Sequence, residues 1–375
     1  MVLRNQARLE SLHSNEDLKM PEPASDYFIF VVNTGSTSTK LSFYRNEEVV
    51  SSATIRHRHD EIEAFKNVWD QYDYRSKIAL DWLKELKKTP SAIVGIGGLL
   101  RPVIGGTYFV SDQMVADARA NLQGEHVSNL GCAIVQKIAQ KFRCPAFVVD
   151  PVSVDEFEVL ARYSGHPLIQ RKSLSHALNI HSAARIAAGK IGKQISETNF
   201  VVAHLGGGIS VAPVKGGRII DANDASSDGP FTPERTGGLP LQQFISLCLS
   251  GDFSEHEIRR LVMGKGGLRA YLGTNSAREV EERMHNGDAA AEEVYRAMAY
   301  QISKEIGAMA AVLKGNVDSV ILTGGLASSK TLVNWIKERV GFIAPVQVYP
   351  GEDEMKSLAL GGLRVLRGEE KAMEY

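Results

Sequence analysis

The sequence predicts a mixed α/β fold that is repeated within one chain. An apolar strand, a turn of Gly, Ser and Thr, and a second strand follow one another over residues 28–44, and a similar order recurs at residues 200–211. In each half these strands are followed by βα units, which is typical of a mixed sheet with helices on its faces. With 375 residues, of which 43% are hydrophobic, the chain is long enough to bury two sizeable cores.

The turn at residues 33–40 has the composition of a phosphate-binding loop. Residues 28–32 are continuously apolar and predict a buried strand, and strand character resumes at Leu41. Between the strands, glycine and short side chains let the backbone approach an anion, so that a phosphate tail and its Mg²⁺ can be bound. An ordinary Ser/Gly hairpin is the alternative, since such turns are common. The candidate ligands here are Asn33, Ser36, Ser38 and Lys40.

Two further glycine turns follow strands in the second half. The apolar strand at residues 200–205 ends in glycines at 206–208 before strand character resumes. The strand at residues 319–323 ends in glycines at 324–325, which open a helix. The first of these turns repeats the pattern at residues 28–44 and therefore indicates a duplicated domain.

Helical and strand patterns fill the rest of the chain. Residues 61–88 carry apolar and aromatic residues at helical spacing, and the longest such stripe, at 289–313, is predicted to be core. The strand at 146–149 ends on Asp150, and open α/β sheets place ligands at such strand ends. The other predicted elements are strands at 92–97, 318–323 and 345–349 and helices at 112–120, 128–141, 176–190, 327–340 and from residue 352.

Composition argues against several classes of partner. The formal net charge is −1 without a long block of Lys or Arg, which disfavours nucleic acid and anionic membranes. No apolar run reaches the length of a membrane span, and the first residues do not resemble a signal peptide. Three cysteines without zinc-ligand spacing favour a reducing, cytoplasmic location. Residues 1–25 are predicted to be a disordered extension, with Met20 as an alternative start.

Several motifs taken together resemble a known family. In chain order they are NTGSTSTK from Asn33, HVSNLG from His126, VDPV from Val149, HALN from His176, HLGGG from His204, PER from Pro233, LTGG from Leu322 and PGEDE from Pro350. Their order and spacing resemble the butyrate kinase branch of the acetokinase family, within the superfamily of acetate kinase, sugar kinases, Hsp70 and actin. The resemblance extends from Tyr27 to Tyr375.

The resemblance implies a fold and a reaction. The fold would be α/β, with two duplicated ribonuclease-H-like (actin-like ATPase) domains and an active-site cleft between them. The domains would span residues 26–150, joined by the helix at 352–375, and residues 151–351. The reaction would be reversible phosphorylation by ATP of butanoate, or of a branched C4–C5 acid, to an acyl phosphate and ADP. Transfer would be direct and in line, and the protein would form a dimer or larger homo-oligomer.

The reaction calls for cations and hydrogen-bond donors, because a carboxylate is already a nucleophile and needs no general base. By the resemblance, Arg235 would clamp the carboxylate or the γ-phosphate, and His176 would donate to the transferring phosphoryl group. His126 would line the same site, and Asp150 would act through Mg²⁺ or orient an arginine. The alternatives are structural: hydrogen-bonded histidines, an ion pair for Arg235 and a turn cap for Asp150.

The resemblance also implies residues that bind the nucleotide and the metal. Those expected to meet the nucleotide are Asn33, Ser36, Ser38, Lys40, His204, Gly206, Gly207, Gly208, Gly324 and Gly325. Those expected to meet Mg²⁺ are Asn33, Glu352, Asp353 and Glu354. For the acidic residues the alternative is a favourable interaction with the dipole of the helix that they open.

Three positions depart from the family pattern. Ile96 stands where an active-site arginine is expected, Thr34 replaces a proline, and residues 225–229 differ from the usual acidic-glycine sequence. Loss of a cation can cost orders of magnitude in rate, unless Arg101 substitutes for it. Two alternatives to the butanoate kinase therefore stay open: a kinase of the same fold for another carboxylate, and a weakly active or non-catalytic nucleotide-binding protein. A P-loop enzyme is disfavoured because GxxxxGK[ST] does not occur.

Overall fold

The computed structural model describes residues 20–21, 24–351 and 353–375. The described chain forms two compact units. The first unit contains the residues up to Arg101, then Gly106–Pro151 and Met355–Tyr375, and the second contains Pro102–Gly105 and Val152–Glu354. Most of the predicted extension at 1–25 and the predicted metal ligand Glu352 lie outside the described residues. The domain boundaries inferred from the sequence stay predictions.

The first unit is built on a six-stranded mixed sheet with the order β3-β2-β1-β4-β6-β5. Strand β1 runs antiparallel to β2 and parallel to β4, and β4 runs parallel to β6. The apolar run at Ile29–Val32 is fully buried, as its composition predicts. The strands are β1 (Phe28–Thr34), β2 (Ser38–Arg45), β3 (Glu48–Arg56), β4 (Ala92–Gly95), β5 (Thr107–Phe109) and β6 (Ala146–Val149).

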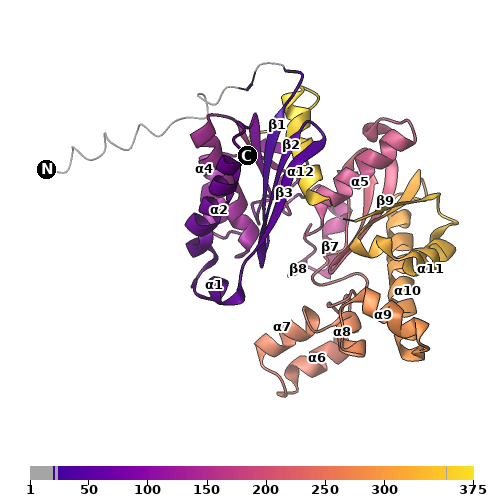
Figure 1. Cartoon of the computed structure of the whole chain (residues 1–375). Helices are drawn as coiled ribbons and strands as arrows, with labels where there is room; N and C mark the ends of the chain where they lie inside the picture. The colour runs from indigo at the N-terminus through magenta and orange to yellow at the C-terminus, as the bar shows by residue number, and fades with distance from the viewer. Residues whose placement is uncertain (1–19, 22–23, 352) are drawn as a thin grey trace. The chain divides into compact units, whose positions relative to one another are not determined.

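Helices cover both faces of this sheet (Figure 1). A side-chain carbon at Gly95 of β4 would lie 2.7 Å from Val135 of α4, and one at Gly362 of α12 would lie 2.6 Å from Val94, the neighbour of Gly95 in β4. Neighbouring strand residues face opposite sides, so α4 and α12 pack on opposite faces, with glycine permitting both close approaches. The helices are α1 (His59–Glu63), α2 (Tyr72–Glu85), α3 (Asp112–Arg119), α4 (Leu130–Phe142) and α12 (Glu354–Leu366), with short 3₁₀ helices η2 (Val68–Gln71) and η3 (Val127–Asn129).

The helical spacing predicted at residues 61–88 is divided among three elements in the structure. The chain forms α1, then η2, then α2. The backbone N–H of Asn67 donates to the Asp70 carboxylate at 3.0 Å, and Asn67 adopts an extended conformation at the start of η2. Local side-chain bonds of this kind compete with helix continuation. The sequence analysis also missed β5 and the short hairpin of β7 (Tyr163–His166) and β8 (Ile169–Gln170), which contain few residues.

The second unit repeats the arrangement in a five-stranded sheet with the order β11-β10-β9-β12-β13. Strand β9 is antiparallel to β10 and parallel to β12, just as β1 is antiparallel to β2 and parallel to β4. The predicted duplication is thus confirmed. The strands are β9 (Asn199–Leu205), β10 (Ile209–Lys215), β11 (Arg218–Ile219), β12 (Ser319–Gly324) and β13 (Val346–Pro350).

Alternate residues of β9 enter two hydrophobic cores. Phe200 and Val202 pack with α5 on one face, while Val201 and Ala203 pack with α10 and α11 on the other (Figure 1). The helices are α5 (Ala177–Lys190), α6 (Leu241–Leu249), α7 (Glu255–Val262), α8 (Gly267–Leu272), α9 (Ala277–His285), α10 (Ala289–Val312) and α11 (Lys330–Val340), with 3₁₀ helices η4 (Val159–Arg162), η5 (Ile195–Glu197) and η6 (Gly325–Ser328).

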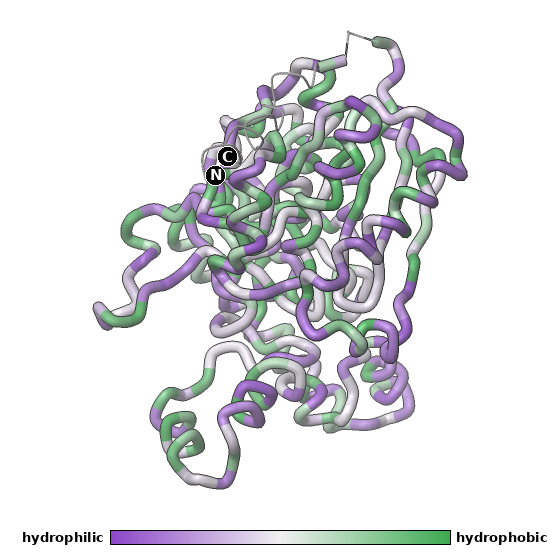
Figure 2. Tube along the Cα trace, turned by 90° about the vertical axis from the view of Figure 1, so that its left-hand side faces the viewer, coloured by the Kyte–Doolittle hydropathy of each residue, from purple (hydrophilic) through white to green (hydrophobic). Residues whose placement is uncertain are grey.

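Hydrophobic and hydrophilic residues alternate along α6 and α7, in the helical part of the second unit (Figure 2). Neither helix buries any residue fully. Within the described part of the chain, we find no helix with the length and apolar character needed to cross a membrane.

Candidate active site

In the first unit, the residues predicted to meet phosphate lie on the turn between β1 and β2 or on the strand ends beside it, and among them Asn33 is buried. Ser36 is exposed and Ser38 half-buried, and the turn is closed by the N–H of Gly35 donating to the Ser38 carbonyl at 2.9 Å. The strand register places Lys40 directly opposite Asn33. Asn33 and Lys40 therefore lie on the strand ends that flank this turn, close to Ser36 and Ser38.

A buried arginine that the sequence analysis missed supports this turn from behind. Arg75 on α2 is fully buried, and its guanidinium donates to the carbonyls of Gly35 and Ser38 at 3.0 and 3.1 Å and to the Thr39 hydroxyl at 3.0 Å. Burial lowers the pKa of Arg75 to about 10. Arg75, Ala79 and Leu83 share the buried stripe of α2. A lone arginine in an apolar helical stripe is the signal that could have revealed it.

We expect the Arg75→Gln substitution to lower the free energy of unfolding by on the order of 3 kcal/mol, because several carbonyl and hydroxyl groups lose a buried charged donor. Urea denaturation followed by circular dichroism measures this change. The matched control is Arg58→Gln, since Arg58 is exposed and pairs only with the exposed Asp60 among the described residues. We expect the control substitution to lower the free energy of unfolding by less than about 1 kcal/mol. Equal effects for both variants would contradict the role assigned to Arg75.

Three parallel strands of the first unit end beside this turn. Val32 of β1 is paired with Gly95 of β4, which is paired with Val148 of β6. One residue further along each strand, Asn33, Ile96 and Val149 are therefore neighbours, with strand spacings of about 4.8 Å. Ile96, the departure from the family pattern, thus lies at the same edge of the sheet as Asn33 and as Asp150, which follows Val149.

Asp150 combines burial with an unusual backbone conformation. Its side chain is almost fully buried, and its φ is +39°, in the left-handed region that residues with a Cβ rarely adopt. One carboxylate oxygen accepts the N–H of Gly106 at 2.7 Å. This hydrogen bond is a structural contact of Asp150, for which the sequence left a structural role open beside a catalytic one. Strained, buried carboxylates of this kind occur often at functional sites.

His126 is tied to the end of β1. The hydroxyl of Thr34 donates to the carbonyl of Val127, at 3.1 Å, and so holds η3 next to the end of β1. The Nδ1 atom of His126 accepts the N–H of Ser128 at 3.2 Å, which leaves the proton of the neutral ring on Nε2. Burial lowers the pKa of His126. The ring can therefore act as a neutral donor.

In the second unit, His176, His204 and Ser210 form one cluster. Ser210 and His204 are directly paired across β10 and β9. The hydroxyl of Ser210 lies 2.9 Å from Nδ1 of His176, which precedes α5. The rings of His176 and His204 are stacked with centroids 4.1 Å apart. When the Ser210 hydroxyl donates to Nδ1, the neutral ring of His176 carries its proton on Nε2.

Arg235 joins the same cluster through Gly208. A side-chain carbon at Gly208 would lie 2.7 Å from the Arg235 guanidinium and 3.2 Å from the His176 ring, so only glycine leaves both side chains in place. The guanidinium donates to the carbonyl of Ala225 at 2.8 Å. The divergent segment 225–229 thus contacts Arg235 through its backbone. Nε of Arg235 is buried, and it has no hydrogen-bond partner among the described residues.

A cavity of about 510 Å³ adjoins this cluster. It is lined by Gly206 and Gly207 of the first glycine turn and by Gly325 of the second, all predicted nucleotide residues. Gly324 has a φ of +91° and lies so close to Leu205 that a side chain would strike its backbone. The sequence analysis missed the remaining lining residues, which carry no local motif: Pro233, Glu234, Asn275 and Leu326. The amide of Asn275 donates to the Glu234 carboxylate at 3.1 Å.

The acidic residues near the C-terminus lie at the start of α12. Asp353 is exposed and Glu354 is half-buried. Among residues 20–21, 24–351 and 353–375, we find no group of three or more His, Cys, Asp or Glu side chains arranged to hold a metal ion. Mg²⁺ in kinase sites is usually held by one or two carboxylates together with phosphates and water. Asp353 and Glu354 can supply carboxylates of that kind.

Comparison with known proteins identifies relatives over nearly the whole chain. The sequence is 47% identical to butyrate kinase 2 of Clostridium acetobutylicum, over 92% of this chain and 99% of that protein. It is 49% identical to the probable butyrate kinase 2 of Caldanaerobacter subterraneus subsp. tengcongensis, with the same coverage of both chains. The acetokinase family profile matches residues 165–342.

Solved structures share the fold at low sequence identity. The acetate kinase of Porphyromonas gingivalis superposes with a TM-score of 0.73 at 16% identity, over 91% of this chain and 99% of that one. A propionate kinase of Francisella tularensis superposes with a TM-score of 0.66 at 18% identity, over 89% and 98%. The actin-like ATPase fold predicted from the sequence is therefore confirmed. With close relatives aligned over almost their full length, the chain belongs to the acetokinase family.

Proposed function

We propose that this protein transfers the γ-phosphoryl group of ATP to butanoate, or to a branched C4–C5 acid, and that the reaction is reversible. Membership of the acetokinase family supports a carboxylate kinase. The observation that carries the assignment of the site is the Arg235 guanidinium, held against Gly208 beside His176 with a buried, unpaired Nε. A buried cationic donor without a partner is costly, and a bound anion would satisfy it.

The residues of the second unit match the demands of phosphoryl transfer. The planar fork of Arg235 can hold a carboxylate or phosphoryl oxygens, and His176 can donate to the oxygens whose charge changes during transfer. His176 also precedes the first turn of α5, whose positive dipole end favours an anion. His204 stacks on His176 and would fix the orientation of its ring.

The residues predicted to bind the nucleotide lie on or beside glycine turns. Its phosphates would meet the turn that carries Ser36 and Ser38, with Arg75 holding that turn in place, and the turn at Gly206–Gly208. The remainder of the nucleotide would enter the cavity lined by Asn275 and Gly325. Mg²⁺ would be held by Asn33 and by Asp353 or Glu354, and it would neutralise phosphate charge. Asp150 and His126 are the further catalytic candidates.

We further infer a cytoplasmic homo-oligomer. Cys132, Cys144 and Cys248 are all unpaired as disulfides, and two of them are buried, which fits a reducing compartment. Subunit number is inferred from the family resemblance alone, as a dimer or a larger assembly.

The first experiment measures acyl phosphate formation. The purified chain is incubated with Mg-ATP and acetate, propionate, butanoate, isobutanoate or isovalerate, and hydroxylamine traps the product. We expect turnover with a preference for four- and five-carbon acids. ADP release without any trapped product while ATP still binds would contradict the proposal for these acids.

The same assay tests the departure at Ile96. Ile96→Arg adds a cation at the sheet edge shared by Asn33 and Asp150, so we expect it to raise kcat by at least about tenfold. Ile96→Leu is the control that keeps an apolar side chain, and we expect it to leave kcat within about twofold. If Ile96→Arg is no faster than the parent chain, the missing cation is not what limits the rate, and Arg101 becomes the candidate substitute.

A further inference from the structure

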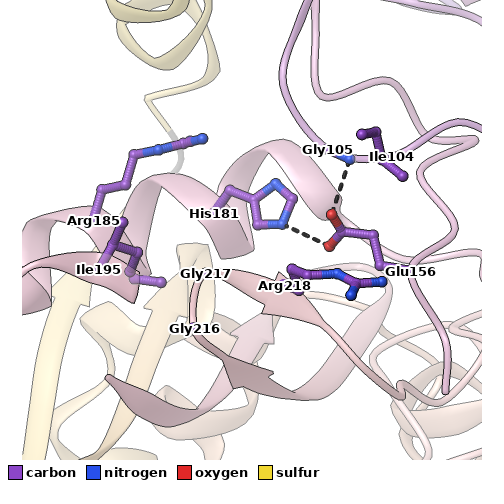
Figure 3. A pocket seen from close by; sticks show the side chains of 10 residues that line it. Ile104, Gly105, Glu156, His181, Arg185, Ile195, Gly216, Gly217 and Arg218 are labelled. Atoms are coloured by element: carbon purple, nitrogen blue, oxygen red, sulfur yellow. Dashed lines mark hydrogen bonds and ion pairs between the residues drawn. The ribbon is translucent and has the colours of Figure 1, made fainter. Parts of the chain in front are cut away.

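A second cavity of about 580 Å³ lies in the second unit, away from the candidate active site. Its lining includes His181 and Arg185 of α5, Arg218 of β11 and the turn at Gly216–Gly217 (Figure 3). Gly208 and Gly216 lie at opposite ends of β10, about eight residues apart, which corresponds to roughly 25 Å. The cavity is therefore distinct from the cluster of Arg235 and His176.

A buried carboxylate and a buried imidazole line this cavity. Glu156 and His181 are almost fully buried, and a carboxylate oxygen of Glu156 lies 3.4 Å from Nε2 of His181. The same carboxylate accepts the N–H of Gly105 at 3.0 Å and of Ile219 at 2.7 Å. Burial raises the pKa of Glu156, but the hydrogen bond from His181 and the two backbone donors outweigh it and lower the pKa overall. Glu156 is thus an ionised carboxylate whose two oxygens are both engaged.

Two arginines supply positive charge at the same cavity. Arg185 lies one helical turn beyond His181 on α5, so the two share a face of the helix. Arg218 is exposed, and its side chain makes no hydrogen bond or ion pair with any residue of the described chain. Figure 3 shows the two arginines on either side of His181. A guanidinium group suits phosphate, because it can donate paired hydrogen bonds to the phosphate oxygens.

The remaining wall is apolar. Ile104 and Ile195 line the cavity, and both glycines of the turn at Gly216–Gly217 have positive φ. A side-chain carbon at Gly217 would lie 3.2 Å from Ile195, so glycine keeps this edge open. Ligand pockets combine such apolar walls with a few polar groups that orient the ligand, and a volume near 580 Å³ is within their usual range.

We propose that this cavity binds a small organic phosphate with a short apolar chain, its phosphate held by Arg185 and Arg218 and its chain packed against Ile104 and Ile195. Ile104 and Gly105 belong to the short segment Pro102–Gly105, which joins the second unit although the residues on both sides of it belong to the first. A ligand here would contact the connection between the units. The site is separate from the proposed reaction and does not depend on it.

The test uses butyl phosphate, a stable phosphate monoester with a four-carbon chain. It is titrated by calorimetry into the full chain saturated with ADP and butanoate, which fill the proposed active site. We expect one saturable site. Arg218→Gln is expected to weaken the affinity at least tenfold, and so is Arg185→Gln. Inorganic phosphate, which lacks the chain, is expected to bind more weakly than butyl phosphate.

Two control variants make the result specific. Lys215→Gln removes an exposed charge from the hairpin of β10 and β11, which also carries Arg218. Lys215 does not line the cavity, so we expect this variant to bind butyl phosphate with unchanged affinity. Arg235→Gln disables the candidate active site and is likewise expected to leave this binding unchanged. The proposal is overturned if no saturable binding occurs, if Arg218→Gln binds as tightly as the parent chain, or if Arg235→Gln abolishes binding. The hydroxylamine assay tests the proposed reaction independently, so failure of that reaction can be distinguished from failure of ligand binding at this cavity.

Discussion

Replacing Arg235 by glutamine is expected to lower kcat by about 10³-fold or more, because an arginine that stabilises the charge of a transferring phosphoryl group contributes effects of this size. The side chain is positioned by the Ala225 carbonyl and by close contact with Gly208, so it is held ready for an anion. Glutamine keeps most of the side-chain length but loses the charge and the paired donors. Steady-state kinetics with Mg-ATP and butanoate measures the loss.

Two further variants test the origin of this effect. Arg235→Lys restores the charge without the planar fork and is expected to recover only part of the rate. Arg259→Gln is the matched control, since Arg259 is an exposed arginine of α7 paired with Glu255. We expect it to keep the parent kcat. If Arg235→Gln changed only the melting temperature and left kcat intact, Arg235 would be a structural residue, as the sequence alone allowed.

The second large effect is expected for His176→Ala, with a decrease in kcat of about 10²–10³-fold. Removing the ring deletes one hydrogen-bond donor to the phosphoryl group, a loss that is felt in the transition state more than in the bound substrate. The KM for ATP should therefore change much less than kcat. Steady-state kinetics over a range of ATP concentrations separates the two parameters.

Ser210→Ala tests how the ring is held. Its hydroxyl contacts Nδ1 of His176, so its removal should loosen the ring and cost less than loss of the ring itself. His256→Ala is the control because His256 is exposed on α7. A decrease in kcat for His176→Ala no larger than that of the control would contradict a role in transfer.

Local sequence carried much of the information about the fold and part of the site. The glycine turns after β1, β9 and β12 could be recognised in the sequence as apolar runs followed by small residues. Only small residues let the backbone of a turn approach another group closely, and this requirement does not depend on the rest of the fold. Residues within one turn, such as Ser36 and Ser38, could be grouped directly. Asp150 could be placed at a strand end by its position after the apolar run of β6.

Residues joined only by packing could not be grouped from the sequence. Arg75 supports a turn about 37 residues earlier in the chain, and Asn275 shares a cavity with Gly206, although neither has a recognisable motif. Likewise, between α1 and α2 the backbone N–H of Asn67 donates to the Asp70 carboxylate, a local bond that competes with an otherwise helical pattern. Helical periodicity reports which face is apolar and does not report such local competition.

The sequence by itself determined the duplicated α/β architecture, the family and the chemical types of the candidate residues, because strand patterns, glycine turns and charged side chains are local properties. Only the tertiary structure decided that Gly208, His176 and Arg235 touch one another, and that Ile96 lies between the strands ending near Asn33 and Asp150. Strand register and helix packing bring such distant segments together. Strand register and helix packing both depend on burying an entire apolar face of a strand or helix, and a single short motif does not contain that information.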